Sequence, residues 1–102
     1  MKIKEVVKLT GIGVQTLLAI IIAQETVRMF NEHYRITITS VSDSIHSRGS
    51  LHYIGNAVDI RIKDMKINIE QYIEALKKAL GKNYDVVKEI DHIHIEYQPK
   101  LS

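Results

Sequence analysis

Hydrophobic residues recur at helical spacing in two segments of the chain. The first covers residues 13–33, and its middle is so apolar that we expect it to pack against a sheet. The positions that make up this pattern are Val14, Leu17, Leu18, Ile21, Ile22 and Met29. The second begins at Asn68, which forms a capping-box pair with Gln71, and Gly81 is a typical residue just after a helix. Its predicted buried stripe is Ile69, Tyr72, Ile73, Leu76 and Leu80.

Alternating hydrophobic and polar positions predict four strands, at residues 34–39, 56–63, 84–88 and 92–97. The polar segment 40–50, SVSDSIHSRGS, separates the first two strands and is predicted to be a loop. The order is helix, strand, loop, strand, helix, strand, strand. This order predicts an α+β fold, in which a small antiparallel sheet is covered by helices on one side.

Two of these strands carry reactive side chains opposite a hydrophobic face. In the strand 56–63, Val58, Ile60 and Ile62 share one face, while Ala57, Asp59 and Arg61 share the other. In the strand 92–97, Ile93, Ile95 and Tyr97 share one face, while His92, His94 and Glu96 share the other. If the polar faces of both strands line one cleft, their side chains can converge on a single ion.

Length and composition restrict the kinds of site that this chain can build. Its 102 residues fit a single domain, 1–102. It contains no cysteine, which excludes disulfides, thiolate zinc sites and a cysteine nucleophile. A net charge of +2 gives no strong electrostatic reason to expect nucleic acid. A mildly basic surface would suit an anionic polymer such as a bacterial cell wall, although an incidental charge is the favoured interpretation.

The beginning of the chain has some features of a secretory signal. Lys2, Lys4 and Lys8 precede an apolar run, but Gln15 and Thr16 interrupt it and no small-x-small cleavage site follows. The run is also too short and too polar to span a membrane. We therefore expect a buried helix, a protein made in the cytoplasm without a clear signal peptide, and no membrane span.

The reactive residues suggest a zinc site. His52, Asp59 and His94 would supply two histidines and one carboxylate, and a catalytic zinc keeps its fourth position for water. A general base must take a proton from that water, and Asp91 is the first candidate, with Glu89 or Glu96 as alternatives. Strict alternation would point Asp91 away from His94, so this role requires a bend or bulge at Asp91.

These motifs resemble a known family. Ser50-x-His52-x-x-Gly55-x-Ala57-x-Asp59, followed downstream by Asp91-x-x-His94, is similar to the zinc D-Ala-D-Ala carboxypeptidases and L-alanyl-D-glutamate endopeptidases. That family includes phage endolysins and vancomycin-resistance dipeptidases, and it shares its fold with the hedgehog signalling domain. The resemblance runs from about Ile36 to Tyr97.

The resemblance implies one zinc ion on His52, Asp59 and His94, with Asp91 as general base. It implies that His92 stabilises the transition state. The implied function is hydrolysis of peptidoglycan stem peptides by a monomer, such as a small phage or prophage lysis enzyme that acts on the cell wall and has no appended wall-binding domain.

The chain departs from the family at one substrate-binding position. Family members often carry an arginine shortly after the first strand, where this chain has Asp43. Arg48 could replace that arginine from the same loop, with His46 and Ser50 beside it, or Arg48 could simply be solvated. Because of this departure, a zinc-containing binding or structural module without turnover is the alternative function. A metal-dependent nuclease is a weaker alternative, since the chain lacks a basic stripe.

Overall fold

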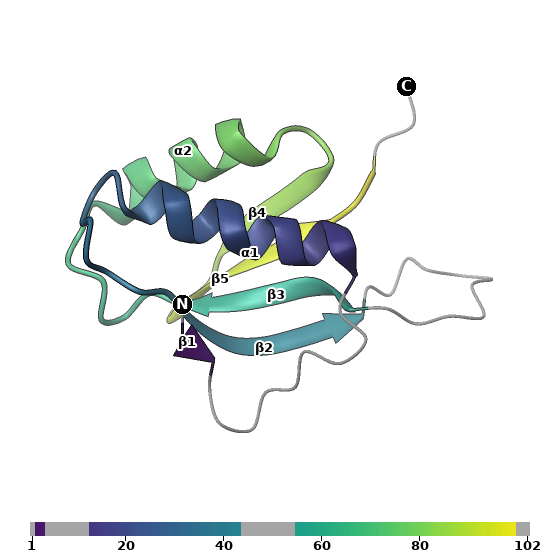
Figure 1. Ribbon diagram of the computed structural model, residues 1–102, viewed down its shortest axis with the longest axis horizontal. Helices are drawn as coiled ribbons and strands as arrows, with labels where there is room; N and C mark the ends of the chain where they lie inside the picture. The colour runs from purple at the N-terminus through teal and green to yellow at the C-terminus, as the bar shows by residue number, and fades with distance from the viewer. Residues whose placement is uncertain (1, 4–12, 44–54, 100–102) are drawn as a thin grey trace.

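The computed structural model describes residues 2–3, 13–43 and 55–99, which form two helices and five strands. In chain order the elements are β1 (Lys2–Ile3), α1 (Val14–Val27), β2 (Thr37–Asp43), β3 (Gly55–Arg61), α2 (Ile69–Leu80), β4 (Tyr84–Lys88) and β5 (His92–Tyr97). The strands form one sheet in the order β1-β2-β3-β5-β4. Both helices lie on the same side of this sheet (Figure 1). The α+β prediction is therefore confirmed.

Strands β2 to β5 pair in antiparallel fashion, as predicted, but β1 adds a short parallel edge beside β2. The two residues of β1 are too few to show any alternation, so the sequence pattern did not predict this strand. The bounds predicted for β4 and β5 agree with the structure. The sheet therefore places β3 and β5 side by side at its centre, with β2 and β4 on their outer sides.

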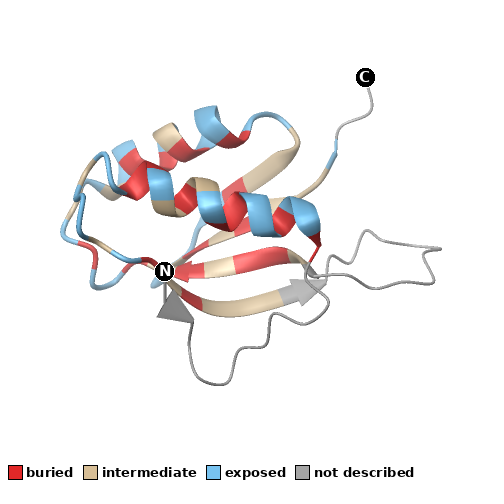
Figure 2. Ribbon diagram, viewed as in Figure 1, coloured by how far each residue is buried: buried red, intermediate tan, exposed pale blue. Residues whose placement is uncertain are grey.

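The hydrophobic core lies between the sheet and the helices (Figure 2). Val58 and Ile60 of β3, and Ile93 and Ile95 of β5, are almost fully buried, so the predicted hydrophobic faces of both strands are correct. Ala57 is also buried, although it shares the opposite face with Asp59. The core cluster further contains Ile36, Ile38, Ile62, Met65, Tyr72, Ile73, Leu76, Leu80 and Val86.

Helix α2 begins and ends where its sequence signals predict. The Asn68 side chain accepts a hydrogen bond from the backbone N–H of Gln71 at 3.0 Å, which satisfies one of the free donors of the first turn. Gly81 follows the helix with φ of 83°, a conformation that costs other residues more than glycine. Tyr72, Ile73, Leu76 and Leu80 are buried, and Ile69 packs partly buried against them.

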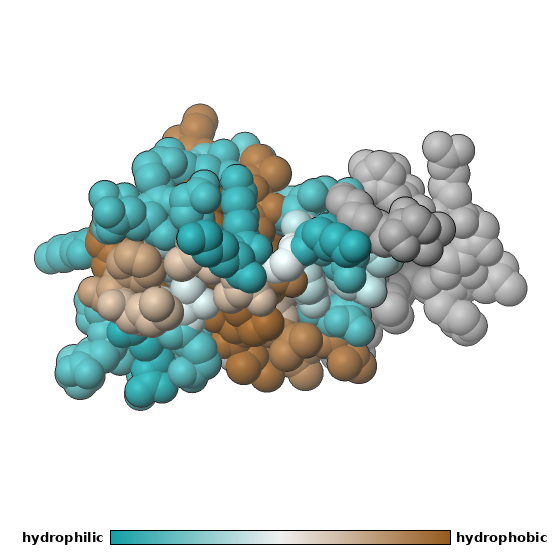
Figure 3. All heavy atoms as spheres, turned by 90° about the horizontal axis from the view of Figure 1, so that it is seen from above, coloured by the Kyte–Doolittle hydropathy of each residue, from teal (hydrophilic) through white to brown (hydrophobic). Residues whose placement is uncertain are grey.

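Helix α1 buries a different face from the one predicted. The buried residues are Thr16, Ala19, Ile20, Ala23, Thr26 and Val27. By contrast, Val14, Leu17, Leu18 and Ile21 are exposed. In the view from above, hydrophobic surface gathers along part of one edge of the molecule (Figure 3). Small side chains on the buried face let the helix approach both the sheet and α2 closely, and the helix is so apolar that its period could not distinguish the two faces.

Helix α1 is also shorter than the predicted 13–33. It ends at Val27, turns follow it, and Met29 and His33 are exposed beyond its end. Within the described residues, neither helix is both long and apolar enough to cross a membrane.

The first long strand lies further along the chain than predicted, at Thr37–Asp43 instead of residues 34–39. The side chain of Gln24 in α1 explains the late start, because its amide donates to the Tyr34 carbonyl at 2.9 Å and accepts from the Ile36 N–H at 3.0 Å. These backbone groups therefore bond to a helix side chain instead of to a neighbouring strand. At the other end, residues 40–43 pair with β3, so the predicted loop over 40–50 begins at least four residues too early.

Strand β3 covers Gly55–Arg61 instead of the predicted 56–63. Its pairing ends early because the chain turns after Arg61, where the Met65 N–H donates to the Ile62 carbonyl. The Ile62 N–H also donates to the Asp91 carbonyl, which holds the chain just before β5 against the end of β3. This contact brings the segment around Asp91 close to the residues of β3.

Candidate metal centre

The candidate centre lies on the face of the sheet that is turned away from the helices. Asp59 of β3 and His94 of β5 are directly opposite each other in the antiparallel register, so their side chains point to the same side. Nδ1 of His94 lies 2.7 Å from Oδ1 of Asp59. The backbone pairing of the two central strands therefore brings together two of the three predicted zinc ligands.

His92 and Asp91 extend this cluster toward the end of the sheet. Nδ1 of His92 lies 2.8 Å from Oδ1 of Asp91, and Nε2 of the same ring lies 3.7 Å from Oδ1 of Asp59. Asp91 occupies the bend that precedes β5, so strand alternation does not control its direction. The role predicted for Asp91 required a bend at this residue, and the structure has one there.

The ionisation of Asp91 is biased by its neighbour. Its hydrogen bond with His92 holds the pKa of the Asp91 carboxyl below its usual value. Asp91 is highly exposed, so this effect acts at the edge of the cluster, where a water molecule or substrate can reach the carboxylate. An ionised and accessible carboxylate is the form that a general base needs.

Glu96 lies at the other end of the His94 ring. Its Oε1 is 3.1 Å from Nε2 of His94, and its Oε2 accepts a hydrogen bond from the side-chain amide of Gln98. Burial lowers the pKa of His94, but the hydrogen bonds and charges of Glu96 and Asp59 outweigh burial, so the net pKa is raised. The imidazole of His94 therefore lies between two carboxylates.

The donor set fits zinc in its chemistry. Imidazole nitrogen and carboxylate oxygen are both common zinc ligands, bound at about 2.0–2.2 Å. Two ligands of a tetrahedral ion at such distances lie about 3.3 Å apart, so Asp59 and His94 need to separate only slightly. Within the described part of the chain, no group of three or more His, Cys, Asp or Glu side chains is placed to hold a metal. The third predicted ligand, His52, lies outside the described residues.

The predicted substrate-binding residues, His46, Arg48 and Ser50, also lie outside the described residues. Asp43, which the resemblance places where family members often carry an arginine, is the last residue of β2 and pairs with Gly55. A cation does occur on the described face, since Arg61 is opposite His92 in the register. The roles of the loop residues remain predictions.

The sequence pattern predicted that Asp59, His92 and His94 lie on polar faces of the strands, but it did not predict the contact between His94 and Glu96. Glu96 was expected only on the polar face of β5, as an alternative general base. Its contact with His94 follows from their spacing, because residues i and i+2 of a strand share a face. The pairing of Asp91 with His92 could not be predicted, because it depends on the bend before β5.

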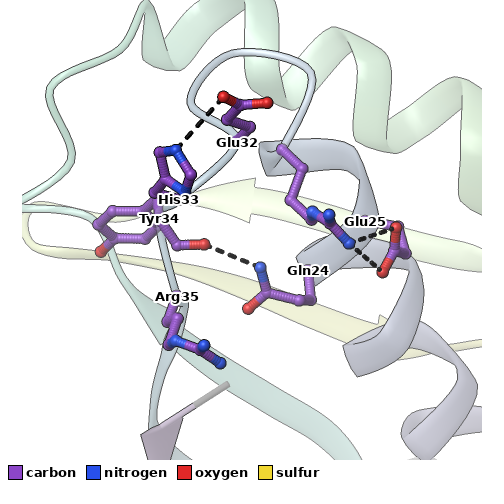
Figure 4. A pocket seen from close by; sticks show the side chains of 7 residues that line it. Gln24, Glu25, Glu32, His33, Tyr34 and Arg35 are labelled. Carbon is purple, nitrogen blue, oxygen red and sulfur yellow. Dashed lines mark hydrogen bonds and ion pairs between the residues drawn. The ribbon is translucent and has the colours of Figure 1, made fainter.

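One cavity of the described surface lies away from the candidate centre. A cavity of about 410 Å³ lies near the end of α1 and is lined by Gln24, Glu25, Arg28, Glu32, His33, Tyr34 and Arg35 (Figure 4). Several of its charges are already paired, since Arg28 contacts Glu25 and His33 contacts Glu32 at 3.3 Å each. None of its lining residues belongs to the candidate centre, so this cavity does not contain the side chains described above.

Comparisons of the chain with protein-family models, with curated proteins and with solved structures find no match. The support for a function therefore comes from the motifs of the sequence and from the contacts between Asp59, His94, His92 and Asp91.

Proposed function

We propose that the protein is a zinc metallopeptidase that hydrolyses peptide bonds in peptidoglycan stem peptides, with one zinc ion on His52, Asp59 and His94. The observation that carries the proposal is the contact of 2.7 Å between Asp59 and His94, on the central strands of the sheet. The bond would be of the D-Ala-D-Ala carboxypeptidase or the L-Ala-D-Glu endopeptidase type. The chain would act on the cell wall as a monomer.

Each predicted site residue would have a separate role in such a reaction. A bound zinc ion would polarise the scissile carbonyl and lower the pKa of its water to about 7. Asp91 would accept a proton from that water, because its carboxylate is accessible and ionised at neutral pH. His92, held by Asp91, would donate a hydrogen bond to the developing oxyanion. Arg48, His46 and Ser50 would bind the substrate.

The test combines zinc content with cleavage of purified peptidoglycan. We expect about one zinc per chain, release of new amino groups from the cell wall, and loss of both in His94→Ala. Asp91→Ala should keep the zinc and lose most activity, about 100-fold or more, because general bases contribute about that much. Glu74→Gln, on the exposed side of α2, is the control and should match the wild type in both measurements.

Substitution of Glu89 tests the choice of base, since Glu89→Gln should leave activity intact if Asp91 is the base. Zinc bound by the wild type without any cleavage of peptidoglycan, under conditions in which a related peptidase cuts it, would refute the proposed activity. That result would favour the second candidate, a zinc-containing module of the same fold without turnover. The presence of Asp43 at the position of the family arginine supports this second candidate.

A further inference from the structure

We propose that Glu96 is a positioning residue that fixes the tautomer and orientation of His94, so that Nδ1 of the ring is free to bind the metal. The expected effect on metal binding rests on the zinc site proposed above. The contacts that support the proposal are those between protein side chains. Glu96 contacts the ring at Nε2, and Asp59 contacts the ring at Nδ1, so each ring nitrogen faces a different carboxylate.

Glu96 is itself held firmly in place. Its side chain is only 15% exposed, and Gln98 donates a hydrogen bond to its second carboxylate oxygen. Its backbone pairs on both sides, with Ala57 of β3 and with Asp85 of β4, because β5 lies between these strands. A carboxylate with so little freedom can direct the ring of a neighbouring histidine instead of following it.

The tautomer follows from the hydrogen-bonding capacity of the groups. A neutral imidazole carries one N–H, and an ionised carboxylate only accepts hydrogen bonds. If the N–H is at Nε2, it donates to Glu96 and leaves the lone pair of Nδ1 directed at the position beside Asp59. If the N–H is at Nδ1, it donates to Asp59. The two predicted ligands are then hydrogen-bonded to each other, and Nδ1 has no lone pair for a metal. Glu96 therefore favours the tautomer in which His94 can bind a metal.

Loss of this contact should weaken zinc binding without removing any ligand. Outer partners of metal-bound histidines typically contribute about 10–100-fold to metal affinity. We expect Glu96→Ala to lower zinc affinity by about that factor. Glu96→Gln should lose less, because its amide oxygen still accepts a hydrogen bond from Nε2 but carries no charge. Glu74→Gln is the matched control, since it removes one carboxylate from the other side of the molecule.

The experiment measures zinc affinity by competition with a chelator and the ring nitrogens of His94 by ¹⁵N NMR. In the zinc-loaded wild type, Nε2 should carry the proton and Nδ1 should show the shift of a metal-bound nitrogen. Zinc affinity of Glu96→Ala within about twofold of the wild type, or a proton on Nδ1 in the zinc-loaded wild type, would overturn the proposal. Far-UV circular dichroism confirms that each variant is folded, and Glu96→Gln provides a second variant should Glu96→Ala unfold.

The two proposals fail in different ways. If the wild type binds no zinc, the proposed function fails, and the metal-free spectra then decide the role of Glu96. An Nε2 proton that is hydrogen-bonded in the wild type and no longer so in Glu96→Ala supports the positioning role. Identical ring spectra in the two proteins refute it, whether or not zinc binds.

Discussion

Two neighbouring isoleucines of helix α1 provide a sharp test of which face it buries. Ile20 is 0% exposed within the core, whereas Ile21 is 48% exposed on the opposite side. Replacement of either residue by alanine removes about three carbon atoms, worth about 0.8 kcal/mol each when they are fully buried. Both substitutions also gain the same small helix propensity, so this contribution cancels in the comparison.

For Ile20→Ala, transfer of the lost carbons accounts for about 2.4 kcal/mol, and the cavity left behind raises the total loss to about 3–4 kcal/mol. For Ile21→Ala, about half of the transfer term applies and solvent fills the space, so the loss is about 1 kcal/mol. The two variants should therefore differ by about 2–3 kcal/mol in free energy of unfolding.

Urea unfolding followed by far-UV circular dichroism measures this difference. With a slope of about 1–2 kcal/mol per molar for a domain of this size, the midpoints should differ by more than about 1 M. A chelator in all samples prevents bound metal from contributing to stability. Equal losses for the two variants would refute the burial assigned to α1. Repetition at several protein concentrations shows whether a second chain covers Ile21, because stability would then depend on concentration.

Three further predictions concern single contacts. Tyr72→Phe removes the buried hydrogen bond of 2.9 Å to the Ala23 carbonyl and should lower the free energy of unfolding by about 0.5–1.5 kcal/mol, measured by urea titration. Asn68→Ala removes the cap of α2 and should cost about 1 kcal/mol, whereas Asn68→Ser should restore most of it. The raised pKa of His94 means that folding favours its protonated form, so in metal-free protein its contribution is complete below the unfolded pKa of about 6.5 and is lost as pH rises through the folded pKa. The stability difference between wild type and His94→Gln should therefore shrink on going from about pH 5 to about pH 9, and a constant difference would contradict this assignment.

The parts of the fold that could be predicted are those whose periodicity and end signals agree. Helix α2 has a polar face, a buried stripe and a cap at each end, and all of these appear in the structure. Helix α1 has apolar residues on most sides, so its pattern predicted a helix but not its buried face. The early part of the first predicted strand fails for a different reason, because Gln24 bonds to the backbone there through contacts distant in sequence.

The candidate centre was predicted in part for equally physical reasons. Alternation along β3 and β5 placed Asp59 and His94 on polar faces, and strands of one sheet can bring two such side chains into contact. Their direct pairing, however, depends on the register between the strands, which alternation alone does not specify. The direction of Asp91 depends on a bend that carries no clear sequence signal. His52 lies outside the described residues, so its role as a ligand remains a prediction.

The register between β3 and β5 also links assembly of the centre to correct folding. A slip of one residue along β5 would turn His94 toward the helices and expose the isoleucines beside it, at a large cost in buried hydrophobic surface. A misaligned chain would therefore lose both its buried core and the contact between Asp59 and His94. If zinc binds this pair as proposed, it binds only the folded sheet, and its binding would raise the free energy of unfolding.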